Sequence, residues 1–321
     1  MGLERQTMIE LYTTMLTIRR FEERVAKEFY AGNLVGFVHS YIGQEAIATG
    51  VCAHLTHKDR IVSHHRGHGH CIAKGADMKR MMAEIYGRKT GYCKGKGGSM
   101  HIADFAIGML GADGIVGAGL PIATGAAMAA QMEGEGNVAA VFFGDGACQE
   151  GEFHEALNLA AIWKLPLLFV LENNHYGVNT PAAYSLAAKD IIRMPDAYHI
   201  PNSAIHGNDV EGVYRAAGEA IALLRRGGGP VFLECETWRL HKHFLSDALE
   251  DLRPAEEREA WAKKCPIATF ETRLLAQNVL TREEMGRIND DILIQVEEAH
   301  RFAVESPYPE PEDALEDVYS T

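Results

Sequence analysis

Two short polar stretches, Gly-Asp-Gly at residues 144–146 and Asn-Asn-His-Tyr at residues 173–176, carry the side chains with the clearest chemical meaning in this sequence. Asn174 follows Asp145 by 29 residues. Each stretch directly follows an apolar run that is typical of a buried strand. Neighbouring parallel strands end at the same edge of a sheet, so we expect a carboxylate and an amide to face one point.

Asp145 and Asn174 offer the hard oxygen ligands that Mg²⁺ prefers, and this ion is commonly shared between a few protein oxygens and a phosphate-bearing ligand. The glycines on either side of Asp145 allow the backbone to approach a diphosphate closely. An isolated Gly-Asp-Gly is usually an ordinary turn. The pairing with Asn174 at this spacing favours a metal and diphosphate site.

A second cluster, residues 64–70, has the sequence His-His-Arg-Gly-His-Gly-His. Zinc binding is one interpretation, but no cysteine or carboxylate stands at ligand spacing, and the glycines disfavour ligation by residues i and i+4 of a helix. The guanidinium of Arg66 is permanently charged and suits a phosphate. The cluster therefore favours anion binding, and zinc binding is the alternative.

A third cluster, residues 241–244, has the sequence His-Lys-His-Phe. Histidine titrates near neutral pH, so His243 is a natural proton shuttle, and it equally suits holding a phosphate oxygen. A solvated charged turn is the alternative interpretation of this cluster.

The whole segment from Gly144 to Gly177 closely resembles the thiamine-diphosphate motif, and it looks like the alpha subunit of the two-chain acetoin and 2-oxo-acid (pyruvate) dehydrogenases. The run SHHRGHGHCIAKG at residues 63–75 looks closer to acetoin than to pyruvate dehydrogenase alpha chains. The resemblance covers nearly the whole chain. It implies a thiamine-diphosphate-binding fold, with thiamine diphosphate and Mg²⁺ as the cofactors.

By this resemblance, the backbone carbonyl of Tyr176 joins Asp145 and Asn174 as a third metal ligand. His243 matches the histidine that ends the family's loop on the cofactor and substrate side. The expected cofactor contacts are His65, Arg66, Gly114, Val116, Asp145, Gly146, Ala147, Asn174, Tyr176 and His243, and the expected catalytic side chains are His39, His101 and His243.

Some positions depart from the family's pattern. Gln149 stands where an asparagine is usual, so its contact near the diphosphate is open, and capping of the next helix is an equal alternative. Lys242 replaces a glycine, which removes the freedom to adopt positive φ and adds a charge near the active-site entrance. Phe244 replaces the serine that mammalian pyruvate dehydrogenases phosphorylate, so that control is not expected. Residues 94–99 lack the spacer and the ending of a P-loop, which excludes ATP binding.

From residue 138 onward, strand and helix patterns alternate, which predicts an α/β fold with a parallel sheet flanked by helices on both faces. Residues 87–119 are rich in glycine and predict a long functional loop or lid. The predicted strands are 61–62, 138–143, 167–172, 203–206 and 230–236, and the predicted helices are 4–31, 45–54, 78–86, 121–132, 150–163, 188–193, 210–226 and 255–304.

Residues 1–254 are predicted to form the thiamine-diphosphate-binding domain, including the N-terminal helix. Residues 255–321 are predicted to add a helical C-terminal extension and an acidic tail to the same unit. We expect the tail to be exposed, and a wrap onto a partner is the alternative.

The composition is that of an ordinary soluble globular protein, with 321 residues of which 47% are hydrophobic. A net charge of −13 disfavours binding to nucleic acid. No apolar run reaches the length of a membrane span, and the first residues lack the apolar region of a signal peptide. The six cysteines form no CxxC pair, so we expect reduced thiols in a cytoplasmic protein.

Thiamine diphosphate also needs a carboxylate near its pyrimidine ring, and single-chain enzymes that supply it are far longer than this one. The resemblance therefore implies a beta subunit that carries the pyrimidine-binding domain, in an α2β2 heterotetramer with the cofactor at each alpha–beta interface. The small residues of 117–130 would permit close helix packing there. The implied function is to cleave acetoin or to decarboxylate a 2-oxo acid, and to pass the two-carbon unit to a lipoyl group or carrier-protein thiol.

Two alternatives stay open. A transketolase-like enzyme would take a two-carbon ketol unit from a ketose phosphate, for which the histidine-rich entrance and Lys242 offer recognition. A non-catalytic assembly subunit would keep the fold without the activity, as the departures at Gln149 and Lys242 suggest.

Overall fold

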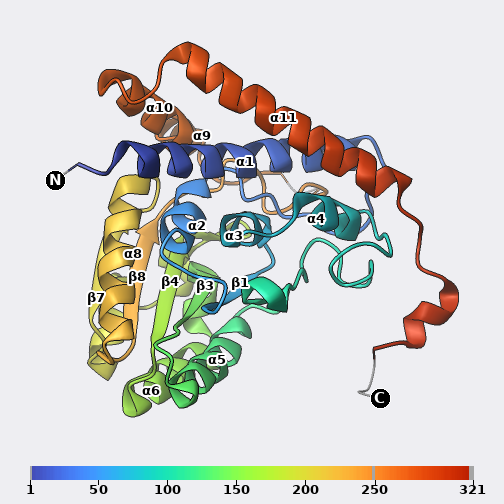
Figure 1. Cartoon of the computed structure of the whole chain (residues 1–321). Helices are drawn as coiled ribbons and strands as arrows, with labels where there is room; N and C mark the ends of the chain where they lie inside the picture. Colours follow the sequence, from blue (N-terminus) through green and yellow to red (C-terminus); the bar gives the residue numbers. More distant parts are fainter. Residues whose placement is uncertain (1, 248–249, 318–321) are drawn as a thin grey trace.

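The computed structural model describes residues 2–247 and 250–317. A six-stranded parallel sheet has the order β2-β1-β3-β4-β8-β7, and helices cover both of its faces (Figure 1). The predicted α/β fold is confirmed. The strands are β1 (Arg60–His64), β2 (Met109–Asp113), β3 (Ala139–Gly144), β4 (Leu167–Asn173), β7 (Asn202–His206) and β8 (Val231–Glu236), and a separate antiparallel pair joins β5 (Tyr176–Gly177) to β6 (Thr180–Pro181).

Alternate side chains along the central strands enter two apolar cores, as expected for a sheet that is buried on both faces. On β3, Phe142 belongs to the first core and Phe143 to the second. The first core is covered by α1 (Arg5–Tyr30), α2 (Glu45–Cys52), α3 (His68–Lys74), α4 (Met78–Ile85), α8 (Val210–Arg225), α10 (Pro266–Ala276) and α11 (Arg282–Glu305), and the second by α5 (Gly119–Glu133), α6 (Gly151–Trp163) and the 3-10 segment η3 (Ile191–Tyr198).

The structure corrects three local expectations. The segment 87–119 is not free of regular structure, because β2 pairs there in parallel with β1 at one edge of the sheet. The helix expected at 188–193 is a 3-10 segment shifted to Ile191–Tyr198, which contains Pro195 and therefore lacks one backbone donor. The glycines of 67–69 do not prevent a helix, since α3 begins at His68. The remaining short elements are η1 (Phe105–Ile107), η2 (Asp145–Gln149), α7 (Ala182–Ser185), α9 (Ala255–Ala262) and η4 (Pro311–Leu315).

The glycine-rich stretch that superficially resembles a P-loop surrounds a carboxylate of the protein itself. Glu84, buried at the end of α4, accepts the backbone N–H groups of Cys93 and Gly95 at 2.8 and 2.9 Å. Its other oxygen accepts those of Gly97 and Gly98 at 2.8 and 3.0 Å. The amides that would hold a phosphate in a P-loop therefore satisfy an internal anion, which agrees with the exclusion of ATP binding.

The C-terminal helices pack on the rest of the chain, with α11 lying across α1 and against α4 (Figure 1). The described part of the acidic tail is largely exposed, as expected, but it is fastened to its own chain. Lys89 pairs with Asp313 at 2.6 Å, and Lys94 and Lys96 pair with Asp317 at 2.8 and 3.1 Å. The division at residue 254 stays a prediction. No described helix has both the length and the apolar character needed to cross a bilayer.

Candidate functional site

A cavity of about 430 Å³ opens at the carboxyl ends of the central strands, where the predicted site residues meet. Among the residues proposed from sequence, only His101 is outside its lining; that side chain is exposed and lies beside Gly114. The assignment of His101 therefore stays a prediction. The cavity is lined by Phe37, His39, His64, His65, Arg66, Met100, Gly114, Val116, Gly117, Phe143, Gly144, Asp145, Gly146, Ala147, Asn174, Tyr176, Gly177, Val178, Arg239, His243 and Phe244.

The carboxylate and the amide meet as the spacing predicts. β3 ends directly before Asp145 and β4 directly before Asn174, and the two strands pair in parallel register. Oδ1 of Asp145 accepts the backbone N–H of Asn174 at 3.3 Å. Oδ2 of Asp145 is buried and has no hydrogen-bond partner among the described residues. Burial raises the pKa of this carboxyl because it disfavours the charged form. A cation bound beside the carboxylate would compensate that charge, so the position suits a cation.

Two buried arginines stand at the same cavity. Arg66 donates to the carbonyls of Ser40 and His243 at 2.7 and 3.1 Å, and Arg239 donates to that of Val178 at 2.7 Å. Burial lowers the pKa of Arg66 to about 10 and that of Arg239 to about 9, so both stay cationic at neutral pH. Arg239 was missed from sequence, because it lies three residues beyond Glu236, the last residue of β8, and not directly after the strand as Asp145 does.

The donor set fits thiamine diphosphate held through Mg²⁺. An unpartnered carboxylate oxygen and an amide suit the metal, and two guanidinium groups suit a diphosphate. An added Cβ on Gly144 would meet nothing within 4 Å, so the backbone beside Asp145 leaves room for a ligand. The carbonyl of Tyr176, the expected third ligand, accepts from Arg239 at 3.3 Å and keeps its second lone pair.

Three imidazoles face one another at the other side of the cavity. The ring centroid of His39 lies 4.6 Å from that of His65 and 5.0 Å from that of His243. Burial, reinforced by the charge of Arg66, lowers the pKa of His39 to about 2 and that of His243 to about 3. Nitrogens of the three rings lie within 4.8 Å of one another, but the positive charge of Arg66 also opposes the binding of Zn²⁺ among them. This charge favours the anion-binding interpretation over zinc binding.

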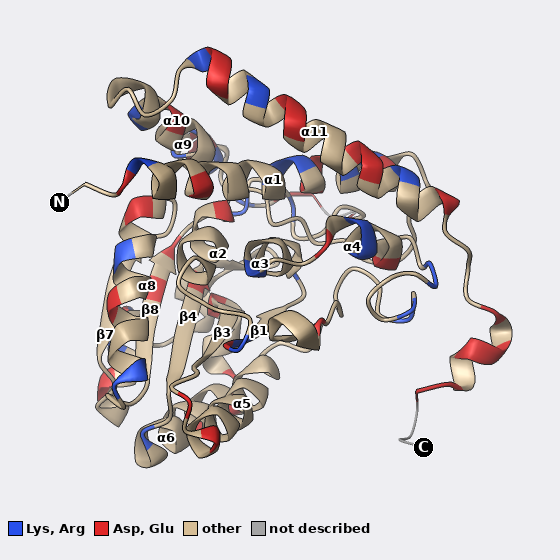
Figure 2. Cartoon of the chain, in the orientation of Figure 1, with Lys and Arg blue, Asp and Glu red and all other residues tan. Residues whose placement is uncertain are grey.

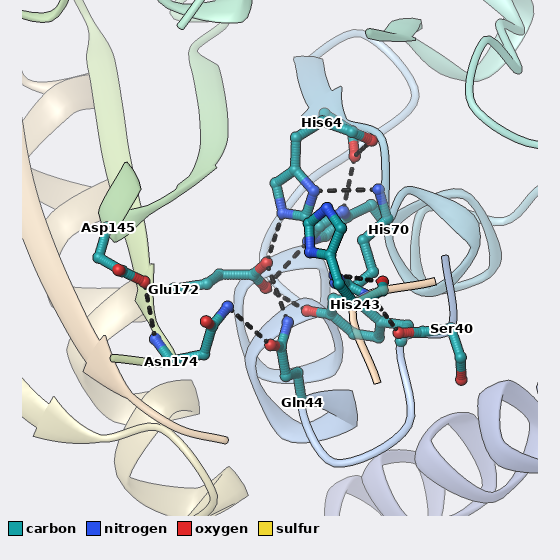
Figure 3. A network of polar contacts seen from close by, with 11 residues as sticks. Ser40, Gln44, His64, His70, Asp145, Glu172, Asn174 and His243 are labelled. Carbon is teal, nitrogen blue, oxygen red and sulfur yellow. Dashed lines mark hydrogen bonds and ion pairs between the residues drawn. The ribbon is translucent and has the colours of Figure 1, made fainter. Parts of the chain in front are cut away.

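No carboxylate stands near the histidine cluster in the sequence, but the fold brings one to it from a distant strand. Glu172, fully buried on β4, accepts from Nε2 of His64 at 2.6 Å and from Nε2 of His70 at 3.1 Å (Figure 3). Tyr41 also donates to it. Although burial opposes ionisation, His70 and His64 hold the pKa of the Glu172 carboxyl well below its usual range. These contacts use the histidine nitrogens that a metal would need.

Two of the residues that depart from the family's pattern, Gln149 and Lys242, do not line the cavity. Gln149 is exposed and approaches the carbonyl of Gly146 at 3.5 Å. It does not cap α6, which has no side-chain cap, so that alternative is wrong. Lys242 is exposed and donates to the carbonyl of Asp247 at 3.3 Å rather than lining the cavity.

A parallel sheet that brings a carboxylate, an amide and two buried arginines together at its carboxyl edge defines an α/β protein with a site that suits a metal and a diphosphate. The model of the dehydrogenase E1 component family matches residues 13–312, and the chain belongs to that family. This membership confirms the predicted recognition and implies thiamine diphosphate as the cofactor.

Relatives extend over almost the full chain. The alpha subunits of acetoin:2,6-dichlorophenolindophenol oxidoreductase from Bacillus subtilis and Cupriavidus necator are 48% and 46% identical, each over 99% of this chain and 95% of the relative. The alpha-3 subunit of the chloroplastic pyruvate dehydrogenase E1 component from rice is 39% identical, over 99% of this chain and 77% of the relative. The greater likeness to the acetoin-type chains agrees with the resemblance seen at residues 63–75.

Proposed function

We propose that this chain is the alpha subunit of a thiamine-diphosphate-dependent enzyme that cleaves acetoin and passes the two-carbon unit to a lipoyl group. The unpartnered, buried Oδ2 of Asp145 beside Asn174 carries the proposal, because a buried carboxylate oxygen without a hydrogen bond is costly unless a cation binds it. The two acetoin-type relatives support acetoin as the substrate.

The chain's own residues hold and orient the reactants. Asp145, Asn174 and the carbonyl of Tyr176 would ligate Mg²⁺, and Arg66 and Arg239 would hold the diphosphate. Once bound, thiamine diphosphate supplies the carbanion and electron-sink chemistry that breaks a C–C bond beside a carbonyl.

The histidines act on the substrate's oxygens. Burial lowers the pKa of His243 to about 3 and that of His39 to about 2, so neither titrates near neutral pH, although the residue type predicts that they would. The neutral imidazoles hydrogen-bond the carbonyl or hydroxyl oxygen and move a proton there as charge develops on that oxygen. His101, which lies outside the lining, would be a further proton carrier, and this role rests on the family resemblance alone.

The lining of the cavity supports a small neutral substrate. Phe37, Met100, Val116 and Phe244 are apolar, and the histidines nearby are neutral. A ketose phosphate would need a further cation, but the exposed Lys242 is not part of the lining. Beyond Arg66 and Arg239, which the diphosphate would occupy, the described lining therefore offers the transketolase-like alternative no further cation for a sugar phosphate.

A beta subunit completes the site. Asp145 is the one carboxylate among the described residues that line the cavity, so the carboxylate for the pyrimidine ring must come from a partner. Figure 2 shows α5 almost without charged side chains, and Ile122, Met128 and Met132 on it are 48%, 42% and 78% exposed. A helix that is apolar all round is normally buried, so α5 supports an interface in an α2β2 assembly.

The six cysteines are free thiols, which supports a cytoplasmic enzyme.

The experiment that tests the proposed function is a native pull-down of the tagged chain, with the partner identified and bound thiamine diphosphate quantified. A similar-sized partner, stoichiometric cofactor and turnover of acetoin that is lost in Asp145→Ala would support the proposal. Unchanged activity of the Asp145→Ala complex would support the non-catalytic assembly subunit instead.

A further inference from the structure

A chain of three side chains leads from the interior of the sheet to the proposed metal position. Nδ2 of Asn174 donates to Oε1 of Gln44 at 3.2 Å, and Nε2 of Gln44 approaches Oε2 of Glu172 at 3.4 Å (Figure 3). Gln44 and Glu172 are fully buried, and neither lines the cavity. The three side chains come from the start of α2 and from the end of β4.

We propose that Gln44, held by Glu172, is a positioning residue that fixes the amide of Asn174 with its oxygen toward the metal. This inference rests on the proposed function, because it takes Asn174 as a ligand of Mg²⁺. An amide presents either an oxygen or an NH₂ group to a neighbour, and only the oxygen ligates a cation.

The direction of the chain follows from the charge at its inner end. An ionised carboxylate only accepts hydrogen bonds, so Gln44 must turn its NH₂ group toward Glu172. Oε1 of Gln44 then points to Asn174 and can only accept, which requires the NH₂ group of Asn174. Oδ1 of Asn174 is left for the metal side, where the backbone N–H of Tyr176 lies at a long 3.4 Å.

The other groups around Glu172 keep it an acceptor. The backbone N–H of Arg66 donates to Nδ1 of His64 at 3.1 Å, so the proton of His64 stands on Nε2 and points at Glu172. His70 and Tyr41 contact the second carboxylate oxygen. The carboxylate therefore holds His64 at the cavity wall and Gln44 behind the metal position through one set of contacts.

The test measures Mn²⁺ in place of Mg²⁺ by electron paramagnetic resonance, in the assembled complex with saturating thiamine diphosphate. Gln44→Met keeps the length of the side chain but removes both hydrogen bonds. We expect it to raise the Mn²⁺ dissociation constant by about 10–100-fold, the usual effect of losing an outer-shell contact. Gln6→Met, at an exposed position on α1 whose side chain contacts Glu10, is the matched control and should change nothing.

A second variant separates orientation from general damage. In Gln44→Glu, an ionised carboxylate would face Glu172 and be repelled, but a protonated one can donate to Glu172 and accept from Asn174 with the native polarity. The neighbouring Glu172 carboxylate favours the protonated form, so Gln44→Glu should bind Mn²⁺ more tightly than Gln44→Met when both are measured at pH 6. Tyr41, His64 and His70 face the same carboxylate, and Asp145 faces the metal, in both variants, so the comparison isolates position 44.

The outcomes distinguish this inference from the proposed function. If Asn174→Ala leaves Mn²⁺ binding unchanged, the metal site itself is wrong. If Asn174→Ala weakens binding but Gln44→Met does not, or if Gln44→Glu binds Mn²⁺ no more tightly than Gln44→Met, the positioning role is wrong and the proposed function stands.

Discussion

One carboxylate oxygen of Asp145 accepts the backbone N–H of Asn174 at 3.3 Å, and its other oxygen is buried without a described partner. Such a group destabilises the cofactor-free protein by about 1–3 kcal/mol. Burial raises its pKa, so the folded chain holds this proton more tightly than the unfolded chain. The contribution of Asp145 to stability therefore falls as the pH rises through its ordinary value toward its raised one, and stays low at neutral pH.

Asp145→Asn is expected to stabilise the cofactor-free chain and to abolish metal-dependent cofactor binding. Asn keeps an oxygen that accepts from Asn174, while it removes the buried charge. The melting temperature without ligands should rise by roughly 2–6 °C at pH 7. Calorimetry at pH 7 and at pH 4 checks the cause, since the gain should shrink at the lower pH. A lower melting temperature at pH 7 would contradict it.

His39, which is buried, and His243, which is half-buried, predict a loss of stability in mild acid. Their folded pKa values, about 2 for His39 and about 3 for His243, lie below the ordinary 6.5. The unfolded chain therefore takes up protons below pH 6.5 that the folded chain does not, and stability falls as the pH falls from about 6.5. Each histidine contributes up to about 2 kcal/mol of this loss at pH 5.

The check is the free energy of unfolding of the cofactor-free chain, measured with urea between pH 7 and pH 5. The double variant His39→Gln/His243→Gln should show a clearly shallower decline, and each single variant a part of that change. An unchanged slope in the double variant would mean that these imidazoles are already protonated in the folded chain.

The meeting of Asp145 and Asn174 could be predicted from the sequence because the pattern that predicts it is local. Asp145 and Asn174 each follow a strand-forming apolar run, so the end of the strand places each side chain. No sequence pattern singles out Glu172, because it is the second-last residue of a strand. Its partners His64 and His70 precede it by 108 and 102 residues. Only the parallel pairing of the strands reveals that this carboxylate lies beside the histidine cluster.

The glycine-rich segment 87–119 shows the same limit. Glycines predicted an irregular segment, and most of 87–119 is irregular, but β2 forms because the exposed edge of β1 offers it a ladder. The role of Glu84 was equally hidden, because a glutamate near the end of a helix is ordinarily a solvated side chain. Its four backbone contacts depend on how residues 93–98 fold back over α4.

Glu84→Gln is expected to loosen this segment. Glutamine keeps a single acceptor oxygen, and its NH₂ group would face backbone donors that the carboxylate now satisfies. Stability should fall by about 2 kcal/mol, and trypsin should cleave after Lys94 and Lys96 several-fold faster. Glu135→Gln, which changes exposed contacts with Lys58 and Asn137, is the control. Equal cleavage rates in the two variants would show that Glu84 does not hold the segment.

The uncharged face of α5 predicts where the beta subunit binds. Ile122 on α5 and Val304 on α11 are 48% and 47% exposed, so the same change to lysine at either position has a similar effect on the isolated fold. Figure 2 shows that α11 carries many charged side chains and α5 almost none. A lysine buried without a partner at an interface costs several kcal/mol.

Ile122→Lys should therefore reduce the amount of partner that co-purifies with the tagged chain by at least tenfold, while Val304→Lys leaves it unchanged. Both variants should keep the wild-type far-ultraviolet circular dichroism, which separates lost assembly from lost folding. Full recovery of the partner with Ile122→Lys would place the interface elsewhere. Loss with Val304→Lys alone would move it to the α11 face of the molecule.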